Sequence, residues 1–158
     1  MSYFDEMITN KKHFLGNLSE SYKIFENIQI DDGLDFVILG PTGIFVLKLI
    51  NLDGPLAFNG NELTRWKIPF PKDILSKISE KAFALKKYLQ LTENHSINAI
   101  LVFSDFRTYL PRELKIINGV FVTQKKNVSK LIQEQKNNLT ASEIQKLENI
   151  LNSFKNGA

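Results

Sequence analysis

The sequence predicts one α/β domain, spanning residues 1–158, with a mixed β-sheet flanked by helices. Short apolar runs bounded by Gly, Pro, Asn and Asp fill the first half of the chain, a pattern typical of strands joined by hairpins. In the second half, helical patterns surround an almost continuous apolar run at residues 97–103, as expected of a central strand buried on both faces. A strand–helix–strand crossover joined to hairpins produces a mixed sheet with helices on both sides.

The first half is predicted to contain one helix followed by a β-meander. Within residues 2–18, apolar side chains recur at helical spacing, with charged residues between them. The runs that follow are rich in β-branched and aromatic residues and are separated by turn residues, as at 31–33 and 40–43. Strands are expected at residues 22–29, 34–39, 44–50, 55–58 and 62–68.

The second half is predicted to alternate helices with strands. A helix over residues 72–91 carries an apolar stripe that includes Ile78 and Phe83, and its outer surface is rich in lysine. Thr140 with Glu143 three residues later forms a capping box, which predicts the start of the last helix. Between these helices we expect a strand at 97–103, a loop at 107–114, a strand at 116–123 and a short helix at 127–133.

The composition narrows the classes of function. Apolar residues make up 43% of the chain and charged residues 23%, which is ordinary for a soluble globular protein. The absence of cysteine excludes disulfides, thiolate zinc sites and a cysteine nucleophile. His13 and His95 lack the spacing of metal ligands, and the sequence contains neither a serine–histidine triad nor a glycine-rich phosphate loop. The net charge of +3 is compatible with nucleic-acid contact without being diagnostic of it.

No targeting or membrane segment is predicted. Residues 1–10 are amphipathic and mixed in charge, unlike a basic region followed by an apolar run. The longest apolar runs, such as that at 97–103, are far too short to span a bilayer. We therefore expect a cytoplasmic location and no membrane partner.

The segment at residues 34–55 contains the most specific motif of the chain. It combines Asp35, a Gly-Pro-Thr-Gly turn at 40–43, an apolar strand, and then Asn51 and Gly54. This arrangement resembles the core of the NERD (nuclease-related) domain, in which an Asp-led strand and a Gly-Pro-x-Gly turn precede a strand with Glu-x-Lys, then Asn and Gly. Three further features are similar to that family: Tyr22-Lys23-Ile24, Trp66, and the C-terminal pattern of Leu139, Thr140, Glu143 and Ile144.

The resemblance implies both a fold and a chemistry. It extends over about residues 5–151 and implies a domain of the restriction-endonuclease-like type. In such a nuclease, two acids would hold Mg²⁺ or Mn²⁺, and a lysine would position water or stabilise charge on phosphate. A Glu-x-Lys pair on one strand would place both side chains on the same face, because strand side chains alternate with period two.

The chain departs from this pattern at its centre. Asp35 matches the first acid, but the Glu position falls on Lys48 and the Lys position falls on Ile50. An acid in the first helix would fall on Asp5 or Glu6, and the segment after the proline-rich break lacks the family's helix Gln. The resemblance therefore implies a relict catalytic site of Asp35, Lys48 and Glu6, with no working metal-dependent nuclease and no metal cofactor.

Lys48 would bring a cation to the position of the metal ion and would repel it. We expect Lys48 to pair with Asp35 across the two strands, so that an internal ion pair replaces the metal. One alternative is that Lys48 extends into solvent from an edge strand. Another is an active nuclease, in which Asp35, Glu6 and a displaced acid such as Asp53 hold Mg²⁺ or Mn²⁺, although Asp is also favoured in turns for backbone reasons.

Basic side chains indicate a second kind of site. Lys77 and Lys81 lie on the helix predicted at 72–91 and are candidates for phosphate contacts, although acids are interspersed among the lysines. Arg107 and Arg112 follow a central strand, and ligands of α/β folds gather outside strand ends. The partner expected is therefore nucleic acid, or else a protein or a second copy of the chain if the relict site has become an interface.

Overall fold

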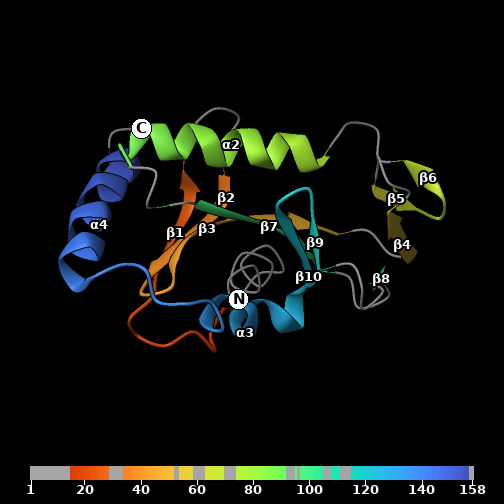
Figure 1. Cartoon of the computed structure of the whole chain (residues 1–158), viewed down its shortest axis with the longest axis horizontal. Helices are drawn as coiled ribbons and strands as arrows, with labels where there is room; N and C mark the ends of the chain where they lie inside the picture. The colour runs from red at the N-terminus through yellow and green to blue at the C-terminus, as the bar shows by residue number, and fades with distance from the viewer. Residues whose placement is uncertain are drawn as a thin grey trace, which may run out of the picture.

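The computed structural model describes residues 15–28, 34–51, 54–58, 63–69, 74–91, 95, 97–104, 108–110 and 115–156. Within these ranges the chain forms a mixed α/β fold with a large and a small β-sheet (Figure 1). The predicted first helix lies outside the described residues except for residues 15–18, which form turns and a bend. The predicted turn at 31–33 also lies outside them.

The large sheet contains β1 (Lys23–Ile28), β2 (Leu34–Gly40), β3 (Gly43–Ile50), β7 (Ile97–Phe103), β9 (Ile116–Ile117) and β10 (Val120–Gln124). Their order across the sheet is β1-β2-β3-β7-β10-β9. The first three strands form the predicted antiparallel meander, whereas β7 runs parallel to both β3 and β10. The prediction of a central strand at 97–103 is therefore confirmed.

Helices cover both faces of the large sheet, as predicted. On one face lie α2 (Ile74–Tyr88) and α4 (Ala141–Asn156), and on the other the short 3-10 helix η1 (Lys125–Asn127) leads into α3 (Val128–Gln133) (Figure 1). Among the helices of the described residues, none has the length and apolar character needed to cross a membrane.

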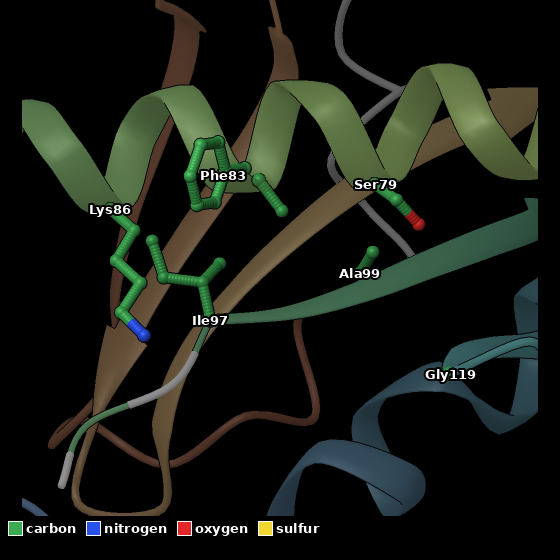
Figure 2. A pocket seen from close by; sticks show the side chains of 7 residues that line it. Ser79, Phe83, Lys86, Ile97, Ala99 and Gly119 are labelled. Atoms are coloured by element: carbon green, nitrogen blue, oxygen red, sulfur yellow. The ribbon is translucent and has the colours of Figure 1, made fainter. Parts of the chain in front are cut away.

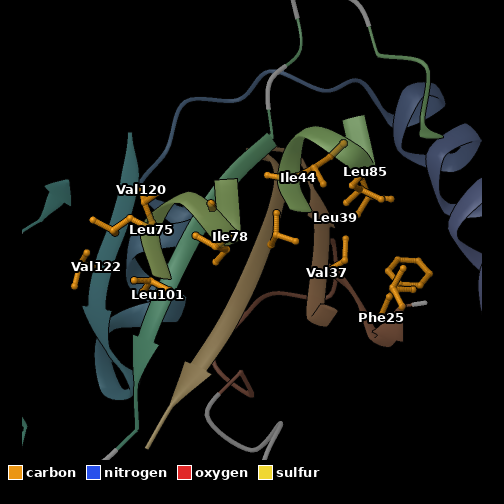
Figure 3. Packing of buried hydrophobic residues seen from close by; sticks show 14 of the residues in the cluster. Phe25, Val37, Leu39, Ile44, Leu75, Ile78, Leu85, Leu101, Val120 and Val122 are labelled. Carbon is orange, nitrogen blue, oxygen red and sulfur yellow. The ribbon is translucent and has the colours of Figure 1, made fainter. Parts of the chain in front are cut away.

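The two faces of the sheet carry separate hydrophobic cores. Along β3, Ile44 and Val46 belong to the core beneath α2 and α4, whereas Phe45 and Leu47 belong to the core beneath α3. This alternation follows from the period-two geometry of a strand. Figure 3 shows side chains of α2, among them Leu85, over the first of these cores. The aromatic residues predicted to be buried, Phe36, Phe45 and Phe103, are all in the cores.

The helix α2 connects two parallel strands and therefore runs antiparallel to both of them. The chain leaves the large sheet at the carboxyl end of β3 and returns through α2 to the start of β7. On the way it builds most of a small sheet, which contains β4 (Gly54–Phe58), β5 (Leu63–Arg65), β6 (Ile68–Pro69) and β8 (Thr108–Tyr109). The small sheet, the first turns of α2 and the carboxyl ends of β3 and β7 thus lie at one end of the molecule (Figure 1).

Two segments predicted as single strands are hairpins instead. The predicted strand at 62–68 is broken by a turn at Trp66 and Lys67, where φ is 55° and 64°, and the flanking residues pair as β5 and β6. The predicted strand at 116–123 is broken in the same way by Asn118 and Gly119, where φ is 50° and 81°. Positive φ at both central residues defines the type I′ turn, whose twist matches that of a two-residue hairpin. Asn-Gly is a strong sequence signal for this turn, whereas Trp-Lys carries no such signal.

The prediction of a helix at 72–91 was right in type but wrong in one residue of its buried face. Leu75 and Ala82 are buried on α2, whereas Phe83 is 59% exposed. The Lys87 ammonium lies 4.7 Å from the centre of the Phe83 ring, a cation–π contact at the surface. The segment predicted as a loop at 107–114 also differs, because two of its residues form β8.

The Gly-Pro-Thr-Gly turn between β2 and β3 is anchored by side chains from distant segments. The buried Thr42 hydroxyl donates a 2.9 Å hydrogen bond to the Ile132 carbonyl of α3. Its oxygen lies 2.8 Å from the Tyr22 hydroxyl, which must therefore be the donor in that second bond. The Tyr22 ring packs against Gly40 so closely that a Cβ atom at this position would collide with it. This part of the motif therefore has a structural task.

The other half of the turn is anchored to the segment before α4. The Pro41 carbonyl accepts hydrogen bonds from the backbone N–H groups of Asn138 and Leu139, at 2.9 and 3.2 Å. Gly43 has a φ of 129°, a conformation that residues with a Cβ atom rarely adopt. The motif thus fastens the β2–β3 hairpin to the C-terminal part of the chain.

The predicted capping box of the last helix is confirmed. The Thr140 hydroxyl accepts a hydrogen bond from the Glu143 N–H at 3.2 Å, and the Glu143 carboxylate accepts one from the Thr140 N–H at 2.9 Å. His95 Nε2 lies 2.7 Å from the other carboxylate oxygen. The backbone hydrogen bond from Thr140 is the main reason that the pKa of Glu143 is lowered.

Candidate functional site

Asp35 and Lys48 face each other across the β2–β3 hairpin. The register of the two strands pairs Phe36 with Leu47, and one residue further along brings Asp35 opposite Lys48. The Lys48 ammonium lies 3.7 Å from Asp35 Oδ2, so the predicted ion pair is present. The two side chains are 47% and 40% exposed, which means that water screens their attraction.

Asp35 has a second partner that the sequence did not reveal. The same oxygen, Oδ2, accepts a hydrogen bond of 3.1 Å from the backbone N–H of Leu49. The carboxylate therefore satisfies a backbone donor at the end of the β2–β3 ladder, in addition to pairing with Lys48. Asp35 consequently has a structural role that requires no metal ion.

The neighbouring position of the motif is apolar and buried. Ile50 lies two residues beyond Lys48 and is part of the core beneath α2, where the family pattern would place a lysine. Because β3 lies between β2 and β7, the alternative in which Lys48 extends from an edge strand is wrong. Lys48 instead emerges from the interior of the sheet near its end, where β3 pairs with β7.

The described residues do not fit a divalent cation at this site. Mg²⁺ and Mn²⁺ require several hard oxygen ligands, and here one carboxylate is already engaged by an ammonium and a backbone N–H. Among the described residues, no three His, Asp or Glu side chains are close enough together to hold a metal ion. The acids considered as replacements, Asp5, Glu6, Asp31, Asp32 and Asp53, lie outside the described residues.

The strand ends beside this pair are tied together by polar contacts. The Ser104 N–H, directly after β7, donates a 3.0 Å hydrogen bond to the Ile50 carbonyl, and its hydroxyl lies 3.4 Å from Asn51 Oδ1. Gly54 follows with a φ of 98°, and a Cβ atom there would collide with the indole of Trp66. Two residues of the sequence motif, Asn51 and Gly54, thus have local structural explanations.

The candidates for phosphate contact are only partly described. Lys77 is exposed at the end of the first turn of α2, and Lys81 lies one turn later with partial exposure. Both stand on the half of the helix nearest the carboxyl end of β3, where Lys48 emerges (Figure 1). Arg107 and Arg112 lie outside the described residues, so their role in a site at the end of the central strand stays a prediction.

A comparison with family models identifies the chain. The model of the nuclease-related domain, NERD, matches residues 5–104, which is more than half of the sequence. The chain belongs to the NERD family. Neither the comparison with curated proteins nor that with solved structures found a match.

The family assignment agrees with the fold and with the central part of the predicted motif. The mixed sheet with helices on both faces is the restriction-endonuclease-like fold expected of a NERD domain. The match contains Asp35, Lys48 and the whole of α2, and it ends directly after β7. The similarity noted around residues 139–144 lies beyond the matched region and stays a prediction.

The NERD domain also has a pocket that is separate from the Asp35–Lys48 pair. It lies between α2 and the first half of β7, is lined by Phe83, Lys86, Ser79 and Ile97 among others, and has a volume of about 210 Å³ (Figure 2). This volume is below the several hundred Å³ typical of small-molecule sites. The pocket lies toward the start of β7, whereas the ion pair lies toward the end of β3, so the two do not form one site.

Proposed function

We propose that this NERD domain has lost metal-dependent cleavage and retains the binding of nucleic acid. The ion pair between Lys48 and Asp35 carries the proposal. Two facing carboxylates repel each other unless a cation lies between them, and this repulsion is what draws a metal ion into such a site. With Lys48 in place of one carboxylate, the cation belongs to the protein itself and the demand for a metal ion disappears.

The same substitution favours the approach of phosphate. With an acid at position 48, the two carboxylates would repel a phosphate in the absence of metal, whereas the Lys48–Asp35 pair is formally neutral and removes that repulsion. The positive charge that would attract phosphate comes from Lys77 and Lys81, on the first half of α2. Glu80 lies between them in sequence and weakens the field without cancelling it. Lysines that neutralise phosphates release counterions, which makes the resulting affinity dependent on salt.

The binding of a fluorescently labelled oligonucleotide, measured by anisotropy over a series of salt concentrations, tests this proposal. We expect the double variant Lys77→Ala/Lys81→Ala to bind more weakly. The slope of log affinity against log salt concentration should become shallower by about 0.7–0.9 for each lysine removed. The matched control is Lys130→Ala/Lys136→Ala, which removes the same charge from exposed positions on and after α3. The control should bind like the unmodified protein.

Two results would contradict the proposal. Affinity that does not fall with salt, or falls equally in both double variants, would exclude phosphate contacts at α2. Cleavage of the labelled strand in Mg²⁺ or Mn²⁺, abolished by Asp35→Asn, would show that the domain is an active nuclease using Asp35 with displaced acids.

A further inference from the structure

The turn between β5 and β6 holds an aromatic residue in a backbone conformation that such residues rarely adopt. Trp66 and Lys67 both have positive φ, at 55° and 64°. The hairpin of β9 and β10 uses the same type of turn with Asn118 and Gly119, the residues best suited to it. Strained positions of this kind cluster at functional sites, because the strain is tolerated for the sake of the side chain that it presents.

The Trp66 side chain is exposed to solvent on one side and packs against Gly54 on the other. It is 59% exposed, and Ile68, two residues further along, is 68% exposed. The indole rests against the backbone of Gly54, where no Cβ atom could be accommodated. The backbone N–H of Trp66 donates a 3.1 Å hydrogen bond to the Pro55 carbonyl, which fixes the start of the turn. The ring is therefore supported on one side while more than half of its surface is free for contact.

The charged side chains in the described part of the small sheet are both cationic. Across the described residues of the small sheet, 54–58, 63–69 and 108–110, the charged side chains are Arg65 and Lys67, which flank Trp66 in the sequence, and no Asp or Glu is present. An exposed aromatic ring with cationic residues beside it in the sequence can combine a stacking surface with phosphate contacts, the pairing used by proteins that bind single-stranded nucleic acid.

We infer that Trp66 stacks on an unpaired base and gives the domain a preference for single-stranded over duplex nucleic acid. The inference rests on the proposed function and names the form of nucleic acid that the domain takes. Bases of a duplex are already stacked on their neighbours, so an indole at the tip of a hairpin can reach a base face only where the strands are separated. The small sheet lies beside the first turns of α2, so a strand held by Trp66 would continue toward Lys77 and Lys81 (Figure 1).

Trp66 is the only tryptophan of the chain, so intrinsic fluorescence reports on this ring alone. The protein is titrated with oligothymidylate and, separately, with a duplex of the same length. We expect quenching by the single strand at concentrations where the duplex causes little change. In anisotropy measurements, Trp66→Ala should lose about tenfold in affinity for oligothymidylate, a loss within the range for removing one stacked base, and Trp66→Phe should retain most of the affinity.

A matched variant separates recognition from folding. Asn adopts positive φ more readily than Trp, which offsets the loss of the contact between the indole and Gly54, so Trp66→Asn should keep a melting temperature close to that of the unmodified protein while losing as much affinity as Trp66→Ala. Oligothymidylate binding without quenching, together with unchanged affinity in Trp66→Asn, would overturn the role of Trp66 and leave the proposed function standing. An absence of binding to either form of DNA would overturn both.

Discussion

The hydrogen bonds that link Thr42 to Tyr22 and to the Ile132 carbonyl permit a quantitative test of why the turn motif contains threonine. Thr42→Val keeps the shape of the side chain but removes the hydroxyl that accepts from Tyr22 and donates to the Ile132 carbonyl. The carbonyl retains a weak 3.4 Å contact with the Gln135 N–H, and the half-buried Tyr22 hydroxyl can find water. We therefore expect the free energy of unfolding to fall by about 1–2 kcal/mol, near the low end for leaving two polar partners without this hydrogen bond.

The measurement is urea denaturation followed by circular dichroism, with Tyr22→Phe and the double variant completing a cycle. Tyr22→Phe removes one hydrogen bond and should cost about 0.5–1 kcal/mol. The double variant should cost less than the sum of the single variants by about 0.5–1 kcal/mol, because both remove the same bond. Costs that add without any coupling, or a neutral Thr42→Val, would refute the arrangement of hydrogen bonds described for this turn.

Three further substitutions probe other parts of the structure. Gly40→Ala should cost about 1–3 kcal/mol because the new Cβ displaces the Tyr22 ring, and the cost measured by thermal denaturation should shrink in a Tyr22→Ala background. Asp35→Ala should destabilise by about 1–2 kcal/mol because the Leu49 N–H loses its acceptor, whereas Lys48→Met should cost below about 1 kcal/mol; equal losses in urea would contradict this assignment. The pKa of Glu143 is lowered in the folded protein, so its carboxylate contributes to stability above the unfolded pKa, and this contribution is lost as the pH falls through the folded pKa, below 4.5. Between pH 6 and pH 3, the stability measured in urea should therefore fall more in the unmodified protein than in Glu143→Gln.

The sequence was sufficient to predict the strands and helices that have local sequence signals. Short apolar runs rich in β-branched and aromatic residues predicted β2, β3 and β7, and the capping box predicted the start of α4. Asp35 and Lys48 were expected to pair because they occupy the positions of the two acids in the family motif, and the register of β2 with β3 places them opposite each other. The Asn118-Gly119 turn also has a local signal, and treating residues 116–123 as one strand missed it.

Other features depend on contacts that no local pattern encodes. Trp66 and Lys67 resemble strand residues, and only the pairing of β5 with β6 and the fit of the indole over Gly54 make them a turn. The hydrogen bond from Leu49 to Asp35 involves a backbone donor, which is present in every residue and gives no signal. Phe83 was assigned to the core on its hydrophobicity, but the buried stripe of α2 passes through Ala82 instead.

The central claim, that Lys48 has replaced the metal ion, is tested most directly by titrating Mn²⁺ while the melting temperature is followed. Lys48→Glu restores two facing carboxylates, and Lys48→Gln is the control that removes the cation without adding an acid. We expect Mn²⁺ to leave the melting temperature of the unmodified protein and of Lys48→Gln unchanged. In Lys48→Glu the melting temperature should rise by about 5–10 °C at Mn²⁺ concentrations near 100-fold above the Kd. A rise in the unmodified protein that disappears in Asp35→Asn would contradict the claim.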